Sequence, residues 1–394
     1  AGVQNRAERL ADGIVPFSFL GALAAWIFTG KPSKALSVFM VDYSCGIKLS
    51  ASISVISAMR EAAAKKIMVK GGKFLEAFAE ADTIIFDKTG TLTEACPAVS
   101  SVLALRGYGE DEILRTAACI EEHFPHSMAR AVVRAACERG LVHEERHADV
   151  EYVVAHGVVT MLDGKRTLIG SAHFVFEDEK IPYNEEDRQI VEKAAEGAAA
   201  LYLAIGGELA GVIFINDPPR NEAADAIAGL RRLGVKNVVM LTGDSENAAR
   251  AVSERLGIDT FRAQVLPAQK AEIIEEYKKN GSKVIMVGDG VNDSPALAAA
   301  DVSVSMRDSS DIAREVADIT LLSADLRELV LLRELSQRLF IRINRNYRFV
   351  IGFNTVLLIF GLTGIMPPGR TALLHNASTI GLSASSARPL LKSL

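Results

Sequence analysis

Three short apolar runs in this 394-residue chain are each followed by a motif in which an aspartate lies within a few residues of glycine or a hydroxyl residue. Such runs suit buried strands of a parallel sheet, whose carboxyl ends meet at one edge. At that edge, carboxylates and accessible backbone N–H groups can hold a phosphoryl group and Mg²⁺. For any single aspartate, a cap on an ordinary turn is the alternative. The motifs that follow these runs are Asp87-Lys88-Thr89, Thr242-Gly243-Asp244 and Gly288-Asp289 with Asp293.

A lysine between the second and third motifs adds to this pattern. Lys270 stands three residues after Pro267, near the expected start of a helix, and its compact ammonium could neutralise a phosphoryl group. Ordinary turns do not account well for four such segments in one chain. The pattern therefore predicts phosphate and magnesium chemistry, with Asp87 as the candidate nucleophile.

The motifs Asp87-Lys-Thr-Gly-Thr91, Thr242-Gly-Asp244 and Gly288-Asp-Gly-Val-Asn-Asp293 resemble the signature of P-type ATPases, cation pumps whose phosphorylation domain has the haloacid-dehalogenase fold. The resemblance covers nearly the whole chain and implies that Asp87 accepts the γ-phosphoryl group of ATP. It further implies that Thr242 and Lys270 contact the phosphoryl group, and that Asp289 binds Mg²⁺ with Asp87 and the Thr89 backbone. Asp293 would complete the pocket. The other implied residues of the site are Lys88, Thr89, Gly243 and Asp244.

The residue two positions after Asp87 separates this chain from related phosphatases. A carboxylate nucleophile divides phosphoryl transfer from hydrolysis, so the aspartyl-phosphate can persist while the protein changes shape. Related phosphatases carry a second aspartate at this position as general acid and base. Here it is Thr89, which cannot relay a proton. We therefore expect a long-lived phosphoenzyme.

An inserted α+β domain is expected to bind ATP. In the heavy-metal class of the family, a glutamate, a His-Pro five residues later and a Gly-x-Gly clasp the adenine. Glu121, His126 and Gly157 match that register, although Ser127 replaces the proline and Ala155 the first glycine. The alternative for His126 is a residue that merely begins a helix. By the same resemblance, Asp217 and Arg220 match the hinge-strand pair near the nucleotide.

The segments are expected to form an α/β chain, with a doubly wound phosphorylation domain and about four transmembrane helices. Strands near 212–215, 237–241, 283–287 and 301–304 would build that domain after the insertion. The predicted boundaries are two transmembrane helices with a metal-site motif at 1–65, the phosphorylation domain at 66–94 and 212–325, the nucleotide-binding domain at 95–211, and two C-terminal transmembrane helices at 326–394.

Long uncharged stretches indicate a multi-pass membrane protein. Residues 13–30 and 349–369 carry no charge and approach or reach the length of a spanning helix, although a signal peptide is the alternative for the first. Arginines in 338–348 precede the second stretch, which favours a cytoplasmic flank over a nucleic-acid patch. We expect a prokaryotic plasma membrane, with the lipid bilayer as a partner and the catalytic domains in the cytoplasm.

Asp42, Cys45 and His375 are the candidate ligands of a transported cation. Cys45 aligns with the Cys-Pro-Cys type of ion site, although Tyr43 replaces the first cysteine and Ser44 the proline. A carboxylate, a thiol and an imidazole suit Zn²⁺, Mn²⁺, Fe²⁺ or Co²⁺ at least as well as Cu⁺. A helix-packing cysteine is the alternative. Basic residues in 60–73 predict a helical stalk that continues from this motif to the strand bearing Asp87.

Composition agrees with this interpretation. The formal net charge is -5 and 49% of residues are hydrophobic, so the composition gives no sign of a nucleic-acid partner and favours membrane segments. Four cysteines without CxxC spacing make a disulfide framework or a structural zinc site improbable.

The family's actuator domain carries a Thr-Gly-Glu motif, and that motif does not occur in this sequence. We therefore expect the C-terminal half of a pump, with a second chain carrying the actuator domain as a partner if the pump is split. The leading hypothesis is ATP-driven export of a transition-metal cation with Mg²⁺ as cofactor, although turnover by this chain alone is doubtful. A non-catalytic nucleotide-binding fragment and a membrane-tethered haloacid-dehalogenase-type phosphatase are the alternatives.

Overall fold

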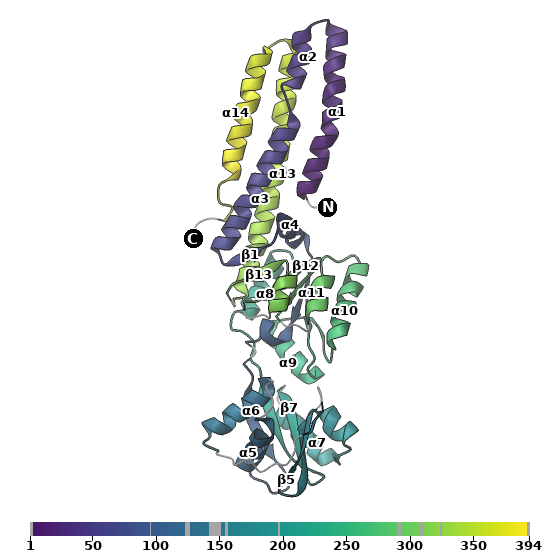
Figure 1. The fold of residues 1–394 in the computed structure, drawn as a ribbon, viewed down its shortest axis with the longest axis vertical. Helices are drawn as coiled ribbons and strands as arrows, with labels where there is room; N and C mark the ends of the chain where they lie inside the picture. Colours follow the sequence, from purple (N-terminus) through teal and green to yellow (C-terminus); the bar gives the residue numbers. More distant parts are fainter. Residues whose placement is uncertain are drawn as a thin grey trace. The chain divides into compact units, whose positions relative to one another are not determined.

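The computed structural model describes the chain except residues 1–2, 95, 123–126, 142–150, 154–156, 196–197, 290–292, 308–310, 324 and 392–394. The contacts divide the chain into two compact units. Unit 1 comprises Ala1–Ile84, Ala228–Asn237 and Ala271–Leu394, and unit 2 comprises Ile85–Ile227 and Val238–Lys270. Unit 1 contains long helices as well as strands, and unit 2 contains a complete antiparallel sheet (Figure 1).

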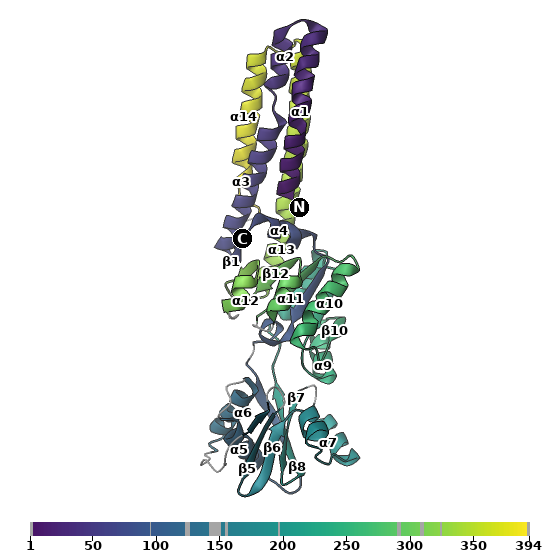
Figure 2. The ribbon, with the colours of Figure 1, turned by 45° about the vertical axis from the view of Figure 1, so that its right-hand side comes forward.

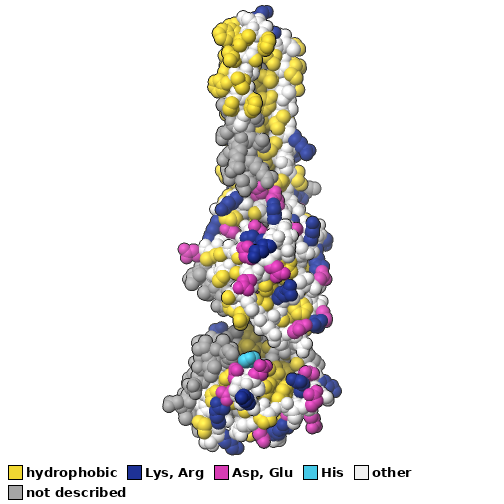
Figure 3. Space-filling view, turned by 90° about the vertical axis from the view of Figure 1, so that its right-hand side faces the viewer, with side chains coloured by type: hydrophobic (Ala, Val, Ile, Leu, Met, Phe, Trp, Pro, Cys, Tyr) yellow, Lys and Arg dark blue, Asp and Glu magenta, His cyan; other side chains and the backbone are white. Residues whose placement is uncertain are grey.

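The long helices of unit 1 run side by side in Figures 1 and 2. They are α1 (Val3–Thr29), α2 (Pro32–Phe39), α3 (Tyr43–Ala64), α13 (Arg327–Thr363) and α14 (Pro368–Ser386). Within the described residues, two segments are long and apolar enough to cross a membrane, Pro32–Ala64 and Arg327–Thr363, and Pro16–Thr29 is a shorter apolar helix. Figure 3 shows hydrophobic side chains over the surface of this helical part. Two candidate spans are thus found, and the remaining two expected spans stay a prediction.

Small residues let these helices approach closely. A Cβ atom at Gly361 of α13 would lie 2.7 Å from the Cβ atom of Ser37 in α2. A Cβ atom at Gly46 of α3 would lie 3.2 Å from a methyl group of Val350 in α13. Small residues at helix crossings are typical of membrane bundles, because close packing replaces the hydrophobic driving force there.

The expected stalk from the Cys45 motif to Asp87 is not one continuous element. Helix α3 ends at Ala64 and is followed by strand β1 (Ile67–Val69), helix α4 (Gly72–Glu80) and strand β2 (Thr83–Asp87). The chain reverses after α3 through Lys66, whose φ is +63°. The prediction of a continuous stalk was therefore wrong, because local basic character did not reveal these breaks. The long continuous helix is α13, with 37 residues.

A seven-stranded sheet has the order β1-β13-β12-β11-β2-β9-β10. Its pairs β9/β10, β11/β12 and β12/β13 are parallel, and the edge strand β1 is antiparallel to β13. Helices alternate with the strands along the chain, so the predicted doubly wound α/β arrangement is confirmed. The strands not yet bounded are β9 (Asn237–Leu241), β10 (Thr260–Arg262), β11 (Val284–Gly288), β12 (Val302–Ser305) and β13 (Ile319–Leu321). The helices between them are α8 (Ala223–Arg232), α9 (Glu246–Leu256), α10 (Pro267–Lys279), α11 (Ser294–Ala299) and α12 (Asp311–Val316).

Unit 2 contains a six-stranded antiparallel sheet of order β3-β8-β7-β6-β5-β4. One hydrophobic cluster includes Ile113 of α5, and a second includes Val191 of α7 together with Phe174, which precedes that helix. The elements are β3 (Ala98–Ala104), α5 (Glu110–Glu121), α6 (Ser127–Glu138), β4 (Glu151–Val153), β5 (Gly157–Leu162), β6 (Lys165–Gly170), α7 (Glu185–Ala195), β7 (Ala199–Ile205) and β8 (Glu208–Asn216).

Strand β8 corrects one sequence prediction. Residues 212–215 were expected in the phosphorylation domain, but β8 pairs with β3 and β7 in the six-stranded sheet. Its side chains alternate between the two clusters, with Ile213 and Ile215 in one and Val212 and Phe214 in the other. A strand covered on both faces has the same uninterrupted apolar run as a parallel strand, so periodicity alone could not distinguish them.

Candidate active site

Asp87 stands at the carboxyl end of β2, all five residues of which are buried. Lys270, in the first turn of α10, donates from Nζ to Asp87 Oδ1 at 2.6 Å. The two residues are 183 positions apart, and each side chain is only 9% exposed. A buried carboxylate with a hydrogen-bonded ammonium is held in one place as an anion, which suits a nucleophile. The fold thus brings together two residues that the sequence singled out separately.

The loop that follows Asp87 is held by hydrogen bonds with Thr93 and Arg220. Gly90 has a φ of +75°, a conformation that favours glycine. Its N–H donates a hydrogen bond to the Thr93 hydroxyl at 3.2 Å. The Thr93 hydroxyl in turn donates to Asp217 Oδ2 at 2.6 Å. Thr93 was not among the predicted site residues. Its only sequence signal is a hydroxyl shortly after a turn glycine, which many turns share.

Arg220 contacts this loop in the structure. Its Nε donates to the Thr91 carbonyl at 2.9 Å, and its Nη2 donates to the Gly90 carbonyl at 3.1 Å. The Arg220 backbone N–H donates to Leu92 at 2.8 Å. The buried guanidinium therefore shapes the backbone beside Asp87, and a nucleotide contact by Arg220 stays a prediction.

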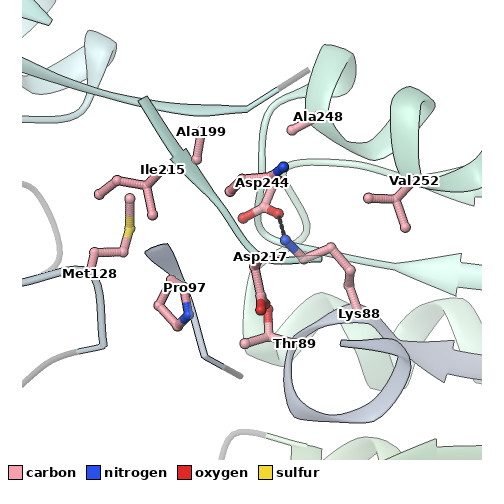
Figure 4. A pocket seen from close by; sticks show the side chains of 11 residues that line it. Lys88, Thr89, Pro97, Met128, Ala199, Ile215, Asp217, Asp244, Ala248 and Val252 are labelled. Atoms are coloured by element: carbon pink, nitrogen blue, oxygen red, sulfur yellow. Dashed lines mark hydrogen bonds and ion pairs between the residues drawn. The ribbon is translucent and has the colours of Figure 1, made fainter. Parts of the chain in front are cut away.

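A pocket within unit 2 lies beside the loop (Figure 4). Its polar side is formed by Lys88, Thr89, Asp217 and Asp244, and the Lys88 ammonium forms an ion pair with the Asp244 carboxylate. Its apolar wall includes Met128 and other residues of the same unit. A pocket with one charged wall and one apolar wall suits a ligand that has both a phosphate part and a flat apolar part. The apolar and small lining residues are Pro97, Met128, Ala199, Ile215, Ala248 and Val252.

Asp217→Asn is expected to raise the thermal stability of the chain at neutral pH more than at acidic pH. Burial raises the pKa of the Asp217 carboxyl above its usual 3.8, while the Thr93 hydrogen bond and the Lys88 charge oppose this. The folded state therefore binds the proton more tightly than the unfolded state. Burying the charged carboxylate therefore lowers the free energy of unfolding. This loss is absent below pH 3.8 and fully present above the raised pKa.

The measurement is the melting temperature of parent and variant between pH 4 and pH 8. The parent should lose stability relative to the Asn variant as the pH rises through this window. A difference in melting temperature that stays constant across the series would contradict the raised pKa.

The second motif forms a tight turn after β9. Thr242 is buried, and its Oγ1 accepts the N–H of Asp244 at 3.1 Å. At Gly243, the nearest atom to a built Cβ would be the Val265 carbonyl oxygen at 3.8 Å, so packing alone does not require glycine. An accessible backbone at Gly243 is consistent with the predicted approach of a phosphoryl group.

The sequence predicts that Asp289 and Asp293, at and beyond the end of β11, hold a metal ion together with Asp87. Three carboxylates supply the hard oxygen donors that Mg²⁺ prefers, so the donor set fits the cofactor that the sequence predicted. Contact of the Thr89 backbone with the ion stays a prediction.

Gly288→Ala is expected to weaken Mg²⁺ binding about tenfold. A Cβ atom at Gly288 would lie 2.9 Å from Asp293 Oδ2, so the carboxylate must shift. The readout is the Mg²⁺ concentration needed to raise the melting temperature, which does not depend on turnover. Gly352→Ala is the control, because nothing lies within 4 Å of a Cβ there. Equal Mg²⁺ responses of the two variants would contradict the prediction.

The predicted adenine contacts are only partly described. Glu121 is 2% exposed at the end of α5, and His126 lies outside the described residues. Gly157 begins β5, where a Cβ atom would lie 2.4 Å from the Phe174 ring and 2.5 Å from the Ile169 carbonyl. Packing therefore explains this glycine without a nucleotide, and neither Glu121 nor Gly157 lines the pocket of Figure 4.

The candidate cation ligands lie on α3 and α14, with α13 between them in a chain of hydrogen bonds. Asp42 caps α3, and its carboxylate accepts the N–H groups of Ser44 at 2.8 Å and Cys45 at 3.1 Å. Asn354 of α13 donates to the Asp42 carbonyl at 3.2 Å and lies 3.3 Å from Nδ1 of buried His375. The described residues do not place the ligand atoms of Asp42, Cys45 and His375 in one compact group. Asn354 thus contacts both Asp42 and His375.

Comparisons with known proteins identify the family. A model of haloacid dehalogenase-like hydrolases matches residues 81–301. Over 98% of its length, the chain is 37% identical to a zinc-exporting P-type ATPase of Mycobacterium marinum and 36% identical to a manganese-exporting P-type ATPase of Mycobacterium bovis. The crystal structure of a zinc-transporting PIB-type ATPase superposes on 96% of the chain, with 30% identity and a TM-score of 0.77. The chain belongs to the heavy-metal P-type ATPase family.

This membership confirms the family resemblance and the α/β fold with a haloacid-dehalogenase-like domain. The chain spans about half the length of the two curated relatives, 53% and 54%. It covers 62% of the zinc-transporting PIB-type structure.

Proposed function

We propose that this chain carries the phosphorylation site of an ATP-driven exporter of a transition-metal cation. The observation that carries the proposal is Asp87, which is buried at the carboxyl end of β2 and lies 2.6 Å from the Lys270 ammonium. Asp87 would be the nucleophilic carboxylate, Lys270 the cation for the transferred phosphoryl group, and Asp289 and Asp293 would add oxygen donors for Mg²⁺. The names of the relatives support metal export.

In the first step, an Asp87 carboxylate oxygen attacks the γ-phosphorus of ATP. The bond from that phosphorus to the β,γ-bridging oxygen breaks, and ADP leaves with the electron pair. Lys270 and Thr242 would hold the γ-phosphoryl oxygens, since fixed donors stabilise developing charge without reorganising. Bound Mg²⁺ would neutralise phosphate charge, with Asp87, Asp289 and Asp293 as its protein ligands.

In the second step, water attacks the phosphorus of the aspartyl-phosphate, and the bond to Asp87 breaks to release phosphate. A general base must take the proton of that water. Thr89, which lines the pocket two positions after Asp87, has no basic group. The phosphoenzyme is therefore expected to accumulate unless another domain or a second chain provides the base.

The nucleotide and cation roles complete the proposal. Glu121, His126 and Gly157 would contact the adenine, with Asp217 near the nucleotide. Asp42, Cys45 and His375 would take part in binding the exported ion in a multi-pass membrane domain, with the catalytic domains in the cytoplasm. Zinc favours imidazole and thiolate ligands and manganese favours oxygen ligands, so the ligands that bind will indicate the cargo.

The test is acid-stable incorporation of label from γ-³²P-ATP and Mg²⁺ into the full chain, with Zn²⁺, Mn²⁺ or a chelator present. Hydroxylamine-sensitive label that disappears in the Asp87→Asn variant is expected. Rapid phosphate release without accumulated label would favour a phosphatase. The absence of Asp87-dependent label with every metal would favour a non-catalytic nucleotide-binding fragment.

A further inference from the structure

The first turns of α13 pack on helices of the phosphorylation domain within unit 1. Val330, Arg333 and Gln337 lie at i, i+3 and i+7 and therefore share one face of the helix. A Cβ atom at Gly229 of α8 would lie 2.9 Å from a Val330 methyl group, so the two helices are in close contact. This face ties α13 to the base of the catalytic sheet.

Arg333 is the charged residue on this face, and it is only 3% exposed. Its Nη1 donates to the Phe78 carbonyl and its Nε donates to the Leu233 carbonyl at 3.4 Å. Gln337, one turn later, donates from Nε2 to the same Leu233 carbonyl at 2.7 Å. Among the described residues, no ion pair joins Arg333 to a carboxylate. Backbone carbonyls therefore provide its compensation.

Both carbonyls belong to helix ends. Phe78 lies in the last turn of α4, and Leu233 directly follows α8. The last carbonyls of a helix lack partners within the helix and carry partial negative charge. One guanidinium thus caps two helices, and these hydrogen bonds help the fold to tolerate a buried arginine.

The two ends of α13 meet different functional regions. Helix α4 continues through Ala81 and Asp82 into β2, which ends at Asp87. Farther along α13, Asn354 is hydrogen-bonded to the Asp42 carbonyl and lies beside His375. From Arg333 to Asn354 the helix advances 354 − 333 = 21 residues, or about 32 Å.

We propose that Arg333 is a positioning residue that transmits displacement of α13 to the α4–β2 segment bearing Asp87. The inference rests on the proposed function, because it assigns to Arg333 the coupling between the cation helices and the phosphorylation site. A guanidinium that binds two helix ends at once resists their separation, whereas an apolar contact permits sliding.

The first test compares phosphorylation in Arg333→Met, Arg333→Lys and the parent, each as the full chain in lipid nanodiscs. Arg333→Met should keep label formation in chelator within about threefold of the parent but lose its stimulation by Zn²⁺ or Mn²⁺. Arg333→Lys, which retains the charge, should recover part of the stimulation. Arg348→Met is the control, since Arg348 is exposed on the same helix. Equal losses of basal and stimulated label would overturn the proposal.

The second test needs no phosphorylation. Asn354→Ala perturbs the membrane end of α13, and hydrogen exchange is measured at the amides of residues 78–84, with and without Arg333→Met. The Asn354→Ala substitution should change exchange there at least threefold in the parent background and leave it unchanged in the Arg333→Met background. An unchanged parent, or an effect that persists without Arg333, would overturn the coupling.

The two tests distinguish failure of the proposed function from failure of the coupling role of Arg333. A parent chain without Asp87-dependent label under any metal contradicts the proposed function. In that case the exchange experiment still decides whether Arg333 couples α13 to α4.

Discussion

Replacing Lys270 with methionine is expected to slow phosphorylation of Asp87 about 100- to 1,000-fold, the usual effect of removing one preorganised charge from a transition state. The Lys270 ammonium lies 2.6 Å from Asp87 Oδ1 and is buried with it. Methionine has a similar length but cannot donate a hydrogen bond or neutralise charge. The measurement is the rate of acid-stable label formation at saturating ATP and Mg²⁺.

Lys279→Met is the matched control, because Lys279 is exposed in the last turn of the same helix, α10. Its rate should stay within about twofold of the parent. Lys270→Arg should restore part of the rate, since it retains a charge near Asp87. A Lys270→Met variant that phosphorylates at the control rate would contradict the role of this ammonium.

Replacing Arg220 with methionine is expected to destabilise unit 2 by about 3 kcal/mol or more. The substitution removes two hydrogen bonds from a charged donor and leaves the Gly90 and Thr91 carbonyls without those partners. The backbone bond from Arg220 to Leu92 would remain. Because the loop carries Lys88 and Thr89, phosphorylation of Asp87 should fall as well.

The measurement is urea unfolding followed by a probe in unit 2, with Arg134→Met as the control. Arg134 also donates to a carbonyl, that of Pro97 at 2.7 Å, but it is exposed. Its loss should cost no more than about 0.5 kcal/mol. If both variants unfold at the same urea concentration, Arg220 does not hold the loop as inferred.

Phosphorylation should therefore depend on residues of two kinds. In the proposed reaction, Asp87 and Lys270 would provide the reacting atoms and the charge that faces them. Arg220 and Thr93 hold the loop backbone from outside the reacting centre, through hydrogen bonds to Gly90, Thr91 and Asp217. Variants of Arg220 and Thr93 should lower the free energy of unfolding as well as the rate of phosphorylation, because these two residues support the fold of the loop.

The sequence by itself predicted the chemistry. One such residue could belong to an ordinary turn, but ordinary turns do not account well for Asp87, Thr242, Asp289 and Lys270 together. The strands β2, β9 and β11 were predicted because continuous apolar runs bounded by glycine are strong local signals. The resulting family assignment is confirmed by relatives across 98% of the chain.

Tertiary structure decided which residues these elements meet. Strand β8 was predicted in the wrong sheet because its apolar run reports burial on two faces and says nothing of its neighbours. The stalk was predicted as continuous because basic residues do not mark where α3 ends. The role of Thr93 and the contacts of Arg220 and Arg333 could not be inferred, since hydrogen bonds between segments that are far apart in the sequence leave no pattern in it.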